Sequence, residues 1–335
     1  MAFSPTIDEL RRDVDEALAA DLRRRAQDLP EARFLIDEMW RLTAAGGKRL
    51  RPAFCYWGFR VSGGAHCDAI LRAASSLELL HTFAIVHDDI MDAADERRGE
   101  EAVHARHGVG VGILVGDLAL VLADDAFMGA GFPAEVTARA FAAYSRMRQE
   151  VIAGQYLDLA YAARSDITVE DARRVAVLKS GRYSIEEPLS IGAALAGAPQ
   201  DFLARLSAFG SPLGEAFQLR DDLLGTFGDR SHVGKPVDSD IIEGKRNVLY
   251  AFAAAATTGE ANAFLTSRWG GDSLTPEEIT RLRDLLESSG ARAATESLLD
   301  EQVRVARNRL DALAPGREER AALEELVYLA TARRA

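Results

Sequence analysis

Helical periodicity runs through nearly the whole chain and limits what it can fold into. Apolar residues recur at intervals of three and four, most clearly from Asp68 to Asp92, which predicts one long helix there. Thr168-Val-Glu-Asp171 has the form of a helix-capping box, and Thr275-Pro276 precedes two acids, as at a helix start. No segment shows the alternation of apolar and polar residues that marks a strand. We therefore expect one all-α domain spanning residues 1–335.

Composition agrees with a helical core and narrows the class of protein. Of the 335 residues, 48% are hydrophobic and only 7% are aromatic, and Ala and Leu dominate the apolar set. The net charge of -12 is opposite to that of a typical nucleic-acid-binding protein. No apolar run approaches the roughly 18 residues of a membrane span, and the N-terminal segment lacks an apolar signal core. We expect a cytoplasmic protein with no nucleic-acid partner and no membrane span.

A first acidic cluster ends the helix predicted from Asp68. Asp88 and Asp92 lie about 40° apart around a helix, and Asp89 about 60° further round, so the three carboxylates share one face. Carboxylates this close repel unless a cation intervenes, and oxygen-only ligands suit Mg²⁺. The alternative is a solvated helix end. Arg97 and Arg98 follow within a few turns and favour a site for metal and diphosphate.

A second carboxylate pair, Asp221-Asp222, also lies in a segment with helical periodicity. We expect the two pairs to face each other across a helical cavity, as metal-binding residues do in bundles. Gly225 stands at the i+4 position, where the first cluster has Asp92, so the second cluster lacks one carboxylate. Asp229 is a candidate to contribute through water.

Basic residues beside glycines are a further indication of an anion-binding site. Gly46-Gly47-Lys48-Arg49-Leu50-Arg51 forms a compact basic turn, and Lys235 and Lys245 each follow a glycine. Glycine lets a phosphate approach the backbone closely. A basic surface patch is the alternative, but on an acidic chain with two aspartate pairs an anion site is favoured. His87 and His104 have no partner at metal-ligand spacing, and we expect both to be structural.

Taken together, these segments resemble the trans-isoprenyl diphosphate synthases, also called polyprenyl synthetases. Each motif is weak alone, but their order and spacing are specific, and they cover about 200 residues of the middle of the chain. The matching segments are GGKRLRP at 46–52, His81, DDIMD at 88–92, RRG at 97–99, GD at 116–117, GQYLDL at 154–159, KSG at 179–181, FQLRDD at 217–222, GKP at 234–236 and EGK at 243–245.

The resemblance implies a fold, an activity and partners. It implies ten or more helices around a deep central cavity, usually in a homodimer. It also implies condensation of isopentenyl diphosphate with an allylic diphosphate, with three Mg²⁺ ions in the active site. The allylic diphosphate leaves, the resulting cation is attacked by the double bond of isopentenyl diphosphate, and loss of a proton completes a product five carbons longer.

The resemblance also implies roles for single residues. Asp88, Asp89, Asp92 and Asp221 would bind the metal ions, with Asp222 in support. The allylic diphosphate would be held by Arg97, Lys179 and Lys235, with Lys245 a further substrate-binding residue. Isopentenyl diphosphate would be held by Lys48, Arg51, His81 and Arg98. Gln218 and the backbone around Lys179 and Ser180 would face the developing carbocation.

Product length in this family follows from the residues before the first aspartate. Phe83 lies five residues and Ala84 four residues before Asp88, and the first cluster has no inserted residues. One aromatic followed by a small residue resembles synthases of geranylgeranyl diphosphate (C20). A farnesyl (C15) product, or one of C25 and longer, is the alternative, and Phe83 is otherwise a core side chain.

Two rival functions are less well supported. A class I terpene cyclase needs a second metal triad with a hydroxyl-bearing residue, where this chain has Gly225, and it has little use for a clamp on isopentenyl diphosphate. A non-catalytic synthase subunit would have lost an aspartate cluster or the basic residues, and this chain retains nearly all of both.

Overall fold

Helices make up most of the described residues, as expected. The structure, a computed structural model, describes residues 5–228, 238–271, 273–313 and 315–332. The prediction of an all-α fold with ten or more helices is confirmed. The chain forms two compact units, and the prediction of a single domain stays a prediction. Unit 1 comprises Met1–Ser145, Glu187–Ser207 and Ala314–Leu326, and unit 2 comprises Arg146–Glu186, Ala208–Leu313 and Val327–Ala335.

Unit 1 is organised around helix α4. Three helices contribute residues to both units, namely α7 (Ala134–Ala162), α10 (Gln200–Phe227) and α16 (Arg317–Thr331). The other elements of unit 1 are α1 (Ile7–Asp28), the 3₁₀ turn η1 (Pro30–Ala32), α2 (Arg33–Ala44), α3 (Leu50–Val61), α4 (Asp68–Met91), β1 (Glu96–Arg97), β2 (Glu100–Glu101), α5 (Val103–His107), α6 (Val109–Met128) and α9 (Glu187–Leu195).

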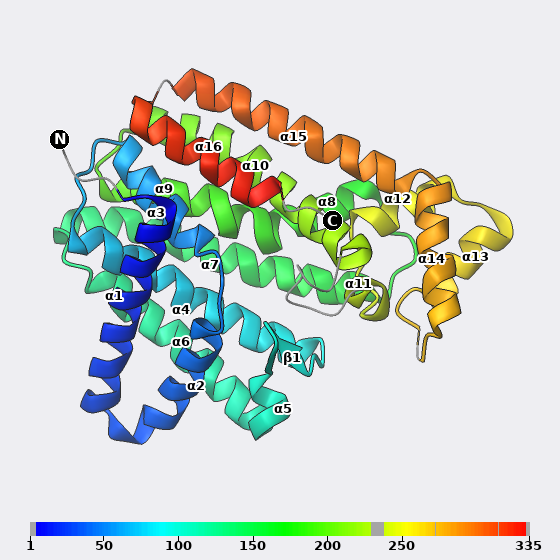
Figure 1. The fold of residues 1–335 in the computed structure, drawn as a ribbon, viewed down its shortest axis with the longest axis horizontal. Helices are drawn as coiled ribbons and strands as arrows, with labels where there is room; N and C mark the ends of the chain where they lie inside the picture. Colours follow the sequence, from blue (N-terminus) through cyan, green and yellow to red (C-terminus); the bar gives the residue numbers. More distant parts are fainter. Residues whose placement is uncertain (1–4, 229–237, 272, 314, 333–335) are drawn as a thin grey trace. The chain divides into compact units, whose positions relative to one another are not determined.

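Helix α4 is buried along most of its length because it packs against α1, α3 and α6. Figure 1 shows α4 and α6 running side by side. Ile70, Leu77 and Leu80 are fully buried, and a buried side chain of this size contributes about 1.5–3 kcal/mol. The sequence predicted this helix to within one residue of its C-terminal end.

Among the described helices, α4 alone is long and apolar enough to meet the requirements of a membrane span. However, 67% of its most apolar stretch is buried inside the protein, and a core helix has the same properties.

Close approach of α3 and α9 explains two glycines of unit 1. A Cβ atom at Gly192 would lie 1.8 Å from the carbonyl oxygen of Cys55, and one at Gly58 would lie 2.2 Å from that of Leu189. Neither position has room for a side chain, so the two helix backbones are in direct contact.

A short antiparallel hairpin, β1–β2, follows α4 and was missed by the sequence analysis. Glu96 pairs with Glu101, and Arg97 pairs with Glu100. The two turn residues, Arg98 and Gly99, have φ values of 57° and 76°. Positive φ at both central residues is typical of a type I′ turn, and it leaves the Arg98 side chain outside the two-residue strands.

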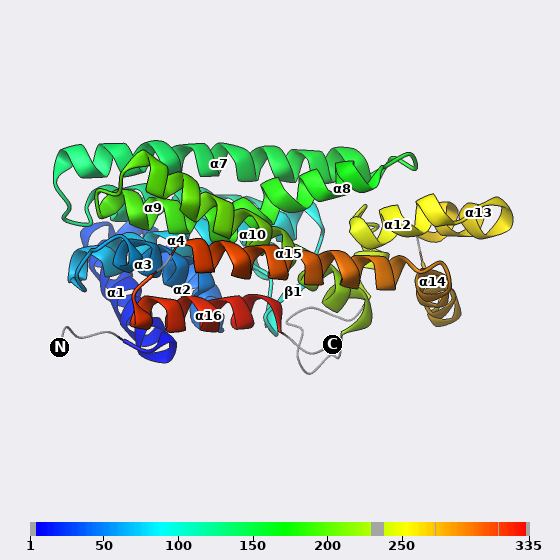
Figure 2. The ribbon, with the colours of Figure 1, turned by 90° about the horizontal axis from the view of Figure 1, so that it is seen from above.

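Unit 2 contains the remaining helices. They are α8 (Val169–Ala176), the π-helix η2 (Val177–Glu186), α11 (Ser239–Ile242), α12 (Val248–Ala256), α13 (Gly259–Arg268), α14 (Pro276–Ser288) and α15 (Ala291–Leu313). Figure 2 shows α12 beside α15, against which it packs.

Both predicted helix starts lie in unit 2 and are confirmed. Thr168 accepts a hydrogen bond from the Asp171 backbone, and the Asp171 carboxylate accepts one from the Thr168 backbone. Thr275 and Glu278 form the same reciprocal pair, with Pro276 at the first helical position.

Candidate functional site

The first acidic cluster is organised by an arginine of the hairpin. Arg97 Nε donates to Asp89 Oδ1 at 2.7 Å, its Nη2 also contacts that oxygen, and Nη2 donates to Asp88 Oδ2 at 3.3 Å. Asp89 is only 1% exposed, whereas Asp88 and Asp92 are half-buried. Asp92 caps the C-terminal end of α4. The three carboxylates therefore differ: Asp89 faces Arg97 inside the protein, and the other two lie nearer the surface.

The basic loop before α3 is tied to the turn of the hairpin. Arg98 Nη1 donates to the Gly46 carbonyl at 2.7 Å, and Arg49 Nη1 donates to the same oxygen at 3.1 Å. Gly46 and Gly47 have φ values of 130° and 134°, and a Cβ at Gly47 would lie 2.7 Å from Arg49 Nη1. Gly47 therefore leaves room for the guanidinium groups, whereas Gly46 is favoured by its backbone conformation alone.

Arg49 has a structural role that the sequence analysis did not predict. Its guanidinium is buried and bonds to Asp15 Oδ1 at 2.6 Å, to Glu78 Oε2 at 3.1 Å and to the Thr43 carbonyl at 2.7 Å. Lys48 and Arg51 on either side are only half-buried. The predicted diphosphate-binding residues thus flank an arginine that holds the loop in place.

His81 lies among these arginines and stays uncharged. Its Nε2 accepts a hydrogen bond from Arg98 Nη2 at 3.1 Å, because a guanidinium only donates. Desolvation, followed by the positive charges of Arg51, Arg98, Arg97 and Arg49, holds the pKa of His81 well below its usual value. Arg49 and Arg97 are paired with carboxylates. Arg98 instead bonds to backbone carbonyls and to His81, and its positive charge favours an anionic ligand here.

Phe83 and Ala84 lie on α4 below the first cluster, and both are half-buried. The alternative to a role in product length was that Phe83 is simply a core side chain. Its partial exposure shows that it is not fully buried in the core. Its ring contacts the ring of His87, with centroids 4.9 Å apart.

The second acidic cluster lies on α10 in unit 2. Asp222 is 4% exposed and accepts a hydrogen bond from Gln218 Nε2 at 2.7 Å, and Asp221 beside it is half-buried. Burial, then the neighbouring carboxylate of Asp240, and more weakly that of Asp221, raise the pKa of Asp222 to about 8. Carboxylates this crowded bind a proton or a cation, so the donor set fits Mg²⁺.

Asp240 explains why residue 225 is glycine. A Cβ atom at Gly225 would lie 2.9 Å from Asp240 Cγ and from one of its carboxylate oxygens. Asp240 is fixed by Asn247, whose Nδ2 donates to Oδ2 at 3.0 Å, while Asn247 Oδ1 caps the start of α12. The carboxylate absent from position 225 thus has a counterpart from α11, which the sequence analysis missed.

The predicted lysines of unit 2 have different surroundings. Lys179 lies on the π-helix, and its Nζ is 2.6 Å from Asp158 Oδ2 on α7. A Cβ at Gly154, one turn before Asp158, would lie 2.4 Å from the Lys179 backbone nitrogen, so this glycine allows the approach. Lys245 Nζ is 2.9 Å from Glu243 Oε2.

The π-helix also touches α10 directly. A Cβ at Gly214 would lie 2.4 Å from the Gly181 carbonyl oxygen, so the two backbones meet here. Ser180 on the π-helix is half-buried, and Gln218 follows Gly214 by one turn. The structure thus places the KSG segment against α10 at Gly214, one turn before Gln218 of the FQLRDD segment.

Several sequence predictions remain untested by this geometry. Lys235 and Asp229 lie outside the described residues. Asp88 belongs to unit 1 and Asp221 to unit 2, so the facing of the two clusters across one cavity stays a prediction. Among the described residues, no three His, Cys, Asp or Glu side chains form a ready-made metal site.

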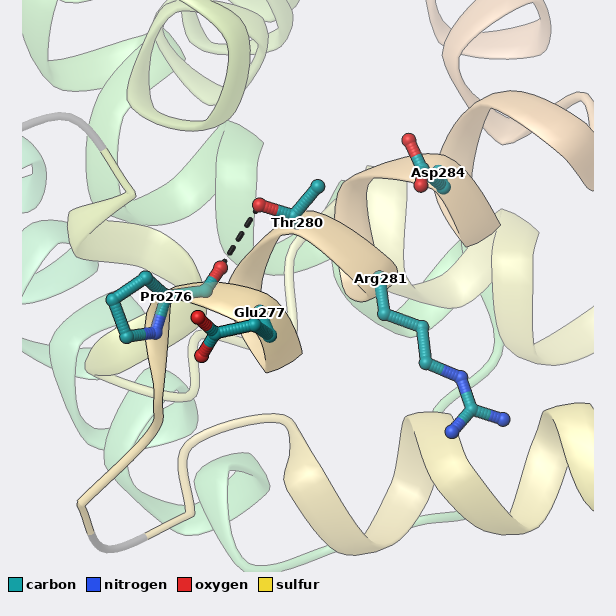
Figure 3. Close-up of a pocket in the computed structure, with 5 residues that line it drawn as sticks. All are labelled: Pro276, Glu277, Thr280, Arg281 and Asp284. Carbon is teal, nitrogen blue, oxygen red and sulfur yellow. Dashed lines mark hydrogen bonds between the residues drawn. The ribbon is translucent and has the colours of Figure 1, made fainter.

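A surface hollow on α14 holds none of these residues. Figure 3 shows its lining by five residues of that helix. Arg281 stacks over the Phe264 ring at 4.0 Å, and Thr280 bonds the carbonyl oxygen of Pro276 at 2.9 Å. These contacts are local to α13 and α14 and give the hollow no evident chemistry.

Comparison with known proteins places this chain in a family. Residues 33–286 match the model of the polyprenyl synthetase family. A geranylgeranyl diphosphate synthase of Sulfolobus acidocaldarius is 34% identical over 267 residues, 78% of each chain. A (2E,6E)-farnesyl diphosphate synthase of Mycobacterium bovis is 34% identical over 249 residues, 73% of this chain and 68% of the relative.

A solved structure is also similar to this chain. The geranylgeranyl pyrophosphate synthase of Corynebacterium glutamicum, crystallised with isoprenyl diphosphate and magnesium, superposes with a TM-score of 0.94. It is 34% identical, and the match covers 98% of this chain and 100% of that one.

The fold and these matches define a trans-prenyltransferase of the short-chain prenyl diphosphate synthase type. The chain belongs to the polyprenyl synthetase family, and the resemblance seen in the sequence is confirmed.

The contrast between Asp89 and Asp92 leads to a stability prediction. Asp89→Asn is expected to lower the free energy of unfolding by about 2 kcal/mol or more, because it weakens a buried charge pair. Asp92→Asn, at the half-buried helix end, is expected to cost less than half as much. Urea unfolding in EDTA measures both, and equal losses would contradict the structural role of Asp89.

The contact between Gly225 and Asp240 leads to a second prediction. Gly225→Asp is expected to lower activity, because the new side chain collides with Asp240, and Asp240→Ala is expected to lower activity about tenfold or more. The double variant Gly225→Asp/Asp240→Ala, which moves the carboxylate, should recover much of that loss.

Gly225→Ala is the control for the steric effect alone. The shift in melting temperature on adding Mg²⁺ gives a readout independent of turnover. A Gly225→Asp variant more active than the natural chain would show that glycine at this position is a deficiency.

Proposed function

We propose that this chain condenses isopentenyl diphosphate with an allylic diphosphate to make geranylgeranyl diphosphate (C20). The observation that carries the proposal is the group of arginines around neutral His81, with an acidic cluster at the end of the same helix. A basic clamp and a carboxylate cluster in one unit suit a reaction that holds one diphosphate and releases another. The names of the relatives support the same reaction.

The basic residues of unit 1 would bind the diphosphate that is retained. Lys48 and Arg51 flank the fixed Arg49, and Arg98 is aimed by the hairpin turn towards His81. A guanidinium group can donate two parallel hydrogen bonds to phosphate oxygens. An uncharged His81 adds a hydrogen-bonding group without adding a positive charge that would repel the arginines. These four residues form the proposed site for isopentenyl diphosphate.

The departing diphosphate would be bound by Arg97, Lys179, Lys235 and Lys245, together with metal ions. Bound Mg²⁺, proposed as three ions, would supply charge neutralisation of the leaving group. Asp88, Asp92, Asp221 and Asp222 have the oxygen donors for it, with Asp240 beside the second pair. Asp89 was predicted as a further metal ligand, and we propose that its main role is to hold the Arg97 side chain in position.

The carbocation formed on the allylic chain needs polar groups that do not react with it. Gln218, whose amide nitrogen is engaged by Asp222, is oriented by that bond, and the backbone around Lys179 and Ser180 lies in a π-helix. π-helical segments are rare and occur frequently at functional sites. We propose that these groups face the cation.

The C20 product rests on Phe83 and Ala84 of α4. Relatives named for C20 and C15 products are equally identical to this chain, so identity does not choose between them. One half-buried aromatic below the first cluster, followed by a small residue, favours C20. Farnesyl diphosphate, or a product of C25 and longer, is the alternative within the family.

One incubation tests the function and its rivals. The purified protein, given Mg²⁺, isopentenyl diphosphate and dimethylallyl, geranyl or farnesyl diphosphate, is expected to yield C20 diphosphate. Asp88→Ala and Asp221→Ala are each expected to lower turnover by about two orders of magnitude or more. Chromatography of the dephosphorylated products gives the readout.

Other outcomes separate the alternatives. A cyclic hydrocarbon indicates a terpene cyclase, and no turnover with any starter indicates a non-catalytic subunit. Variants with near-normal rates would reject the metal-binding role of the aspartates.

A homodimer is the proposed assembly, and α6 of unit 1 offers a surface for it. Leu114, Val121 and Met128 recur every seven residues and are 55%, 57% and 52% exposed. Large apolar side chains in an exposed row are typical of an interface. We further propose a cytoplasmic location.

Breaking this row tests the dimer. Val121→Glu is expected to shift the protein towards monomer, because it places a charge in the apolar row, and analytical ultracentrifugation measures the mass. Leu29→Glu is the matched control, since Leu29 is 53% exposed at the end of α1. Dissociation by both variants, or by neither, would contradict the role of α6.

A further inference from the structure

We propose that His87 positions the ring of Phe83 and thereby helps to set product length, with Gly116 of α6 providing the space for its imidazole. This inference rests on the proposed function, in which Phe83 limits the growing chain. It assigns a role to a histidine that the sequence analysis expected to be merely structural.

The two rings are in direct contact. Phe83 and His87 lie one turn apart on α4, and their centroids are 4.9 Å apart with ring planes at 62°. This edge-to-face arrangement is favoured by the charge distribution of aromatic rings. His87 Nδ1 also lies 3.1 Å from the carbonyl oxygen of Phe83. Since a carbonyl oxygen only accepts, Nδ1 is the donor, and this bond fixes the imidazole against its own helix.

Helix α6 holds the other side of the imidazole. A Cβ atom at Gly116 would lie 2.2 Å from His87 Cε1 and 2.5 Å from Nδ1, so no residue larger than glycine fits without moving the ring. Glycine inside a helix is less stable than alanine, and contact with His87 explains why it is present here.

Asp117 completes the surroundings of His87. Its Oδ1 lies 3.5 Å from Nε2, and its side chain is 61% exposed, whereas that of His87 is 17% exposed. The imidazole is thus held by the Phe83 carbonyl on one nitrogen and faces a carboxylate on the other. Its orientation is set by α4 and α6 together.

Phe83 depends on this support because it is only half-buried. A fully buried ring is fixed by contacts on every side, but a half-buried ring turns when a neighbour is removed. Loss of His87 would free the Phe83 ring to move aside, and a longer chain would then be accommodated. An edge-to-face pair is worth about 0.5–1.5 kcal/mol, which corresponds to roughly a two- to tenfold change in population.

The experiment compares product lengths in five variants. Phe83→Ala tests the limit itself, His87→Ala removes the supporting ring, and Gly116→Ala displaces it. Gly112→Ala is the matched control, because it lies one turn earlier on α6 and its Cβ would meet the Ile90 side chain of α4 at 2.9 Å. The fifth variant is Phe83→Ala/His87→Ala.

The expected result is a rise in the ratio of C25 and longer products to C20 in three single variants. His87→Ala and Gly116→Ala should each raise it roughly two- to tenfold, Phe83→Ala should raise it further, and Gly112→Ala should leave it unchanged. The double variant should match Phe83→Ala, because His87 acts only through Phe83. A merely structural role would lower the melting temperature or turnover without moving this ratio.

Two failures are distinguishable. If Phe83→Ala lengthens the product but His87→Ala and Gly116→Ala do not, the role of His87 is overturned and the proposed function stands. If the natural chain makes no C20 diphosphate, or Phe83→Ala leaves the C20 profile unchanged, the product-length assignment itself falls.

Discussion

Two buried carboxylates on α4, Glu78 and Asp89, make the arginine-rich part of unit 1 possible. Glu78 is 3% exposed and pairs with Arg49, and Asp89 is 1% exposed and pairs with Arg97. A guanidinium taken out of water without such a partner would cost several kcal/mol. Because both acids project from one helix, the arginines gather along it. Burial of the imidazole, and then the positive charges of these arginines, hold the pKa of His81 well below its usual value.

The sequence was sufficient to predict the helical class and several helix boundaries, and it supplied the candidate residues of the proposed site. Periodicity and capping residues are local signals, so the helix from Asp68 and the starts at Thr168 and Thr275 were predicted correctly. The two aspartate pairs could be found because each is contiguous. Their motifs also sufficed to identify the family.

What the sequence did not show depends on contacts between distant segments. The hairpin at 96–101 has strands of two residues, too short for an alternating pattern. Asp240 and Asp158 contact Gly225 and Lys179, which lie in other helices. No local motif marked Asp240, and the GQYLDL segment that contains Asp158 did not show that this acid pairs with Lys179. The different burial of Asp89 and Asp88, adjacent in sequence, likewise follows from where Arg97 comes to lie.

The turn of the hairpin has a consequence for how tightly an anion is held. Arg98 has a left-handed backbone, a conformation that costs a non-glycine residue about 1 kcal/mol or more, and its guanidinium is already anchored to Gly46 and His81. A free arginine side chain loses about 2 kcal/mol of rotational entropy when it is immobilised by a ligand. Because folding already immobilises Arg98, a diphosphate bound at the proposed site would lose less of its binding energy to the ordering of this side chain.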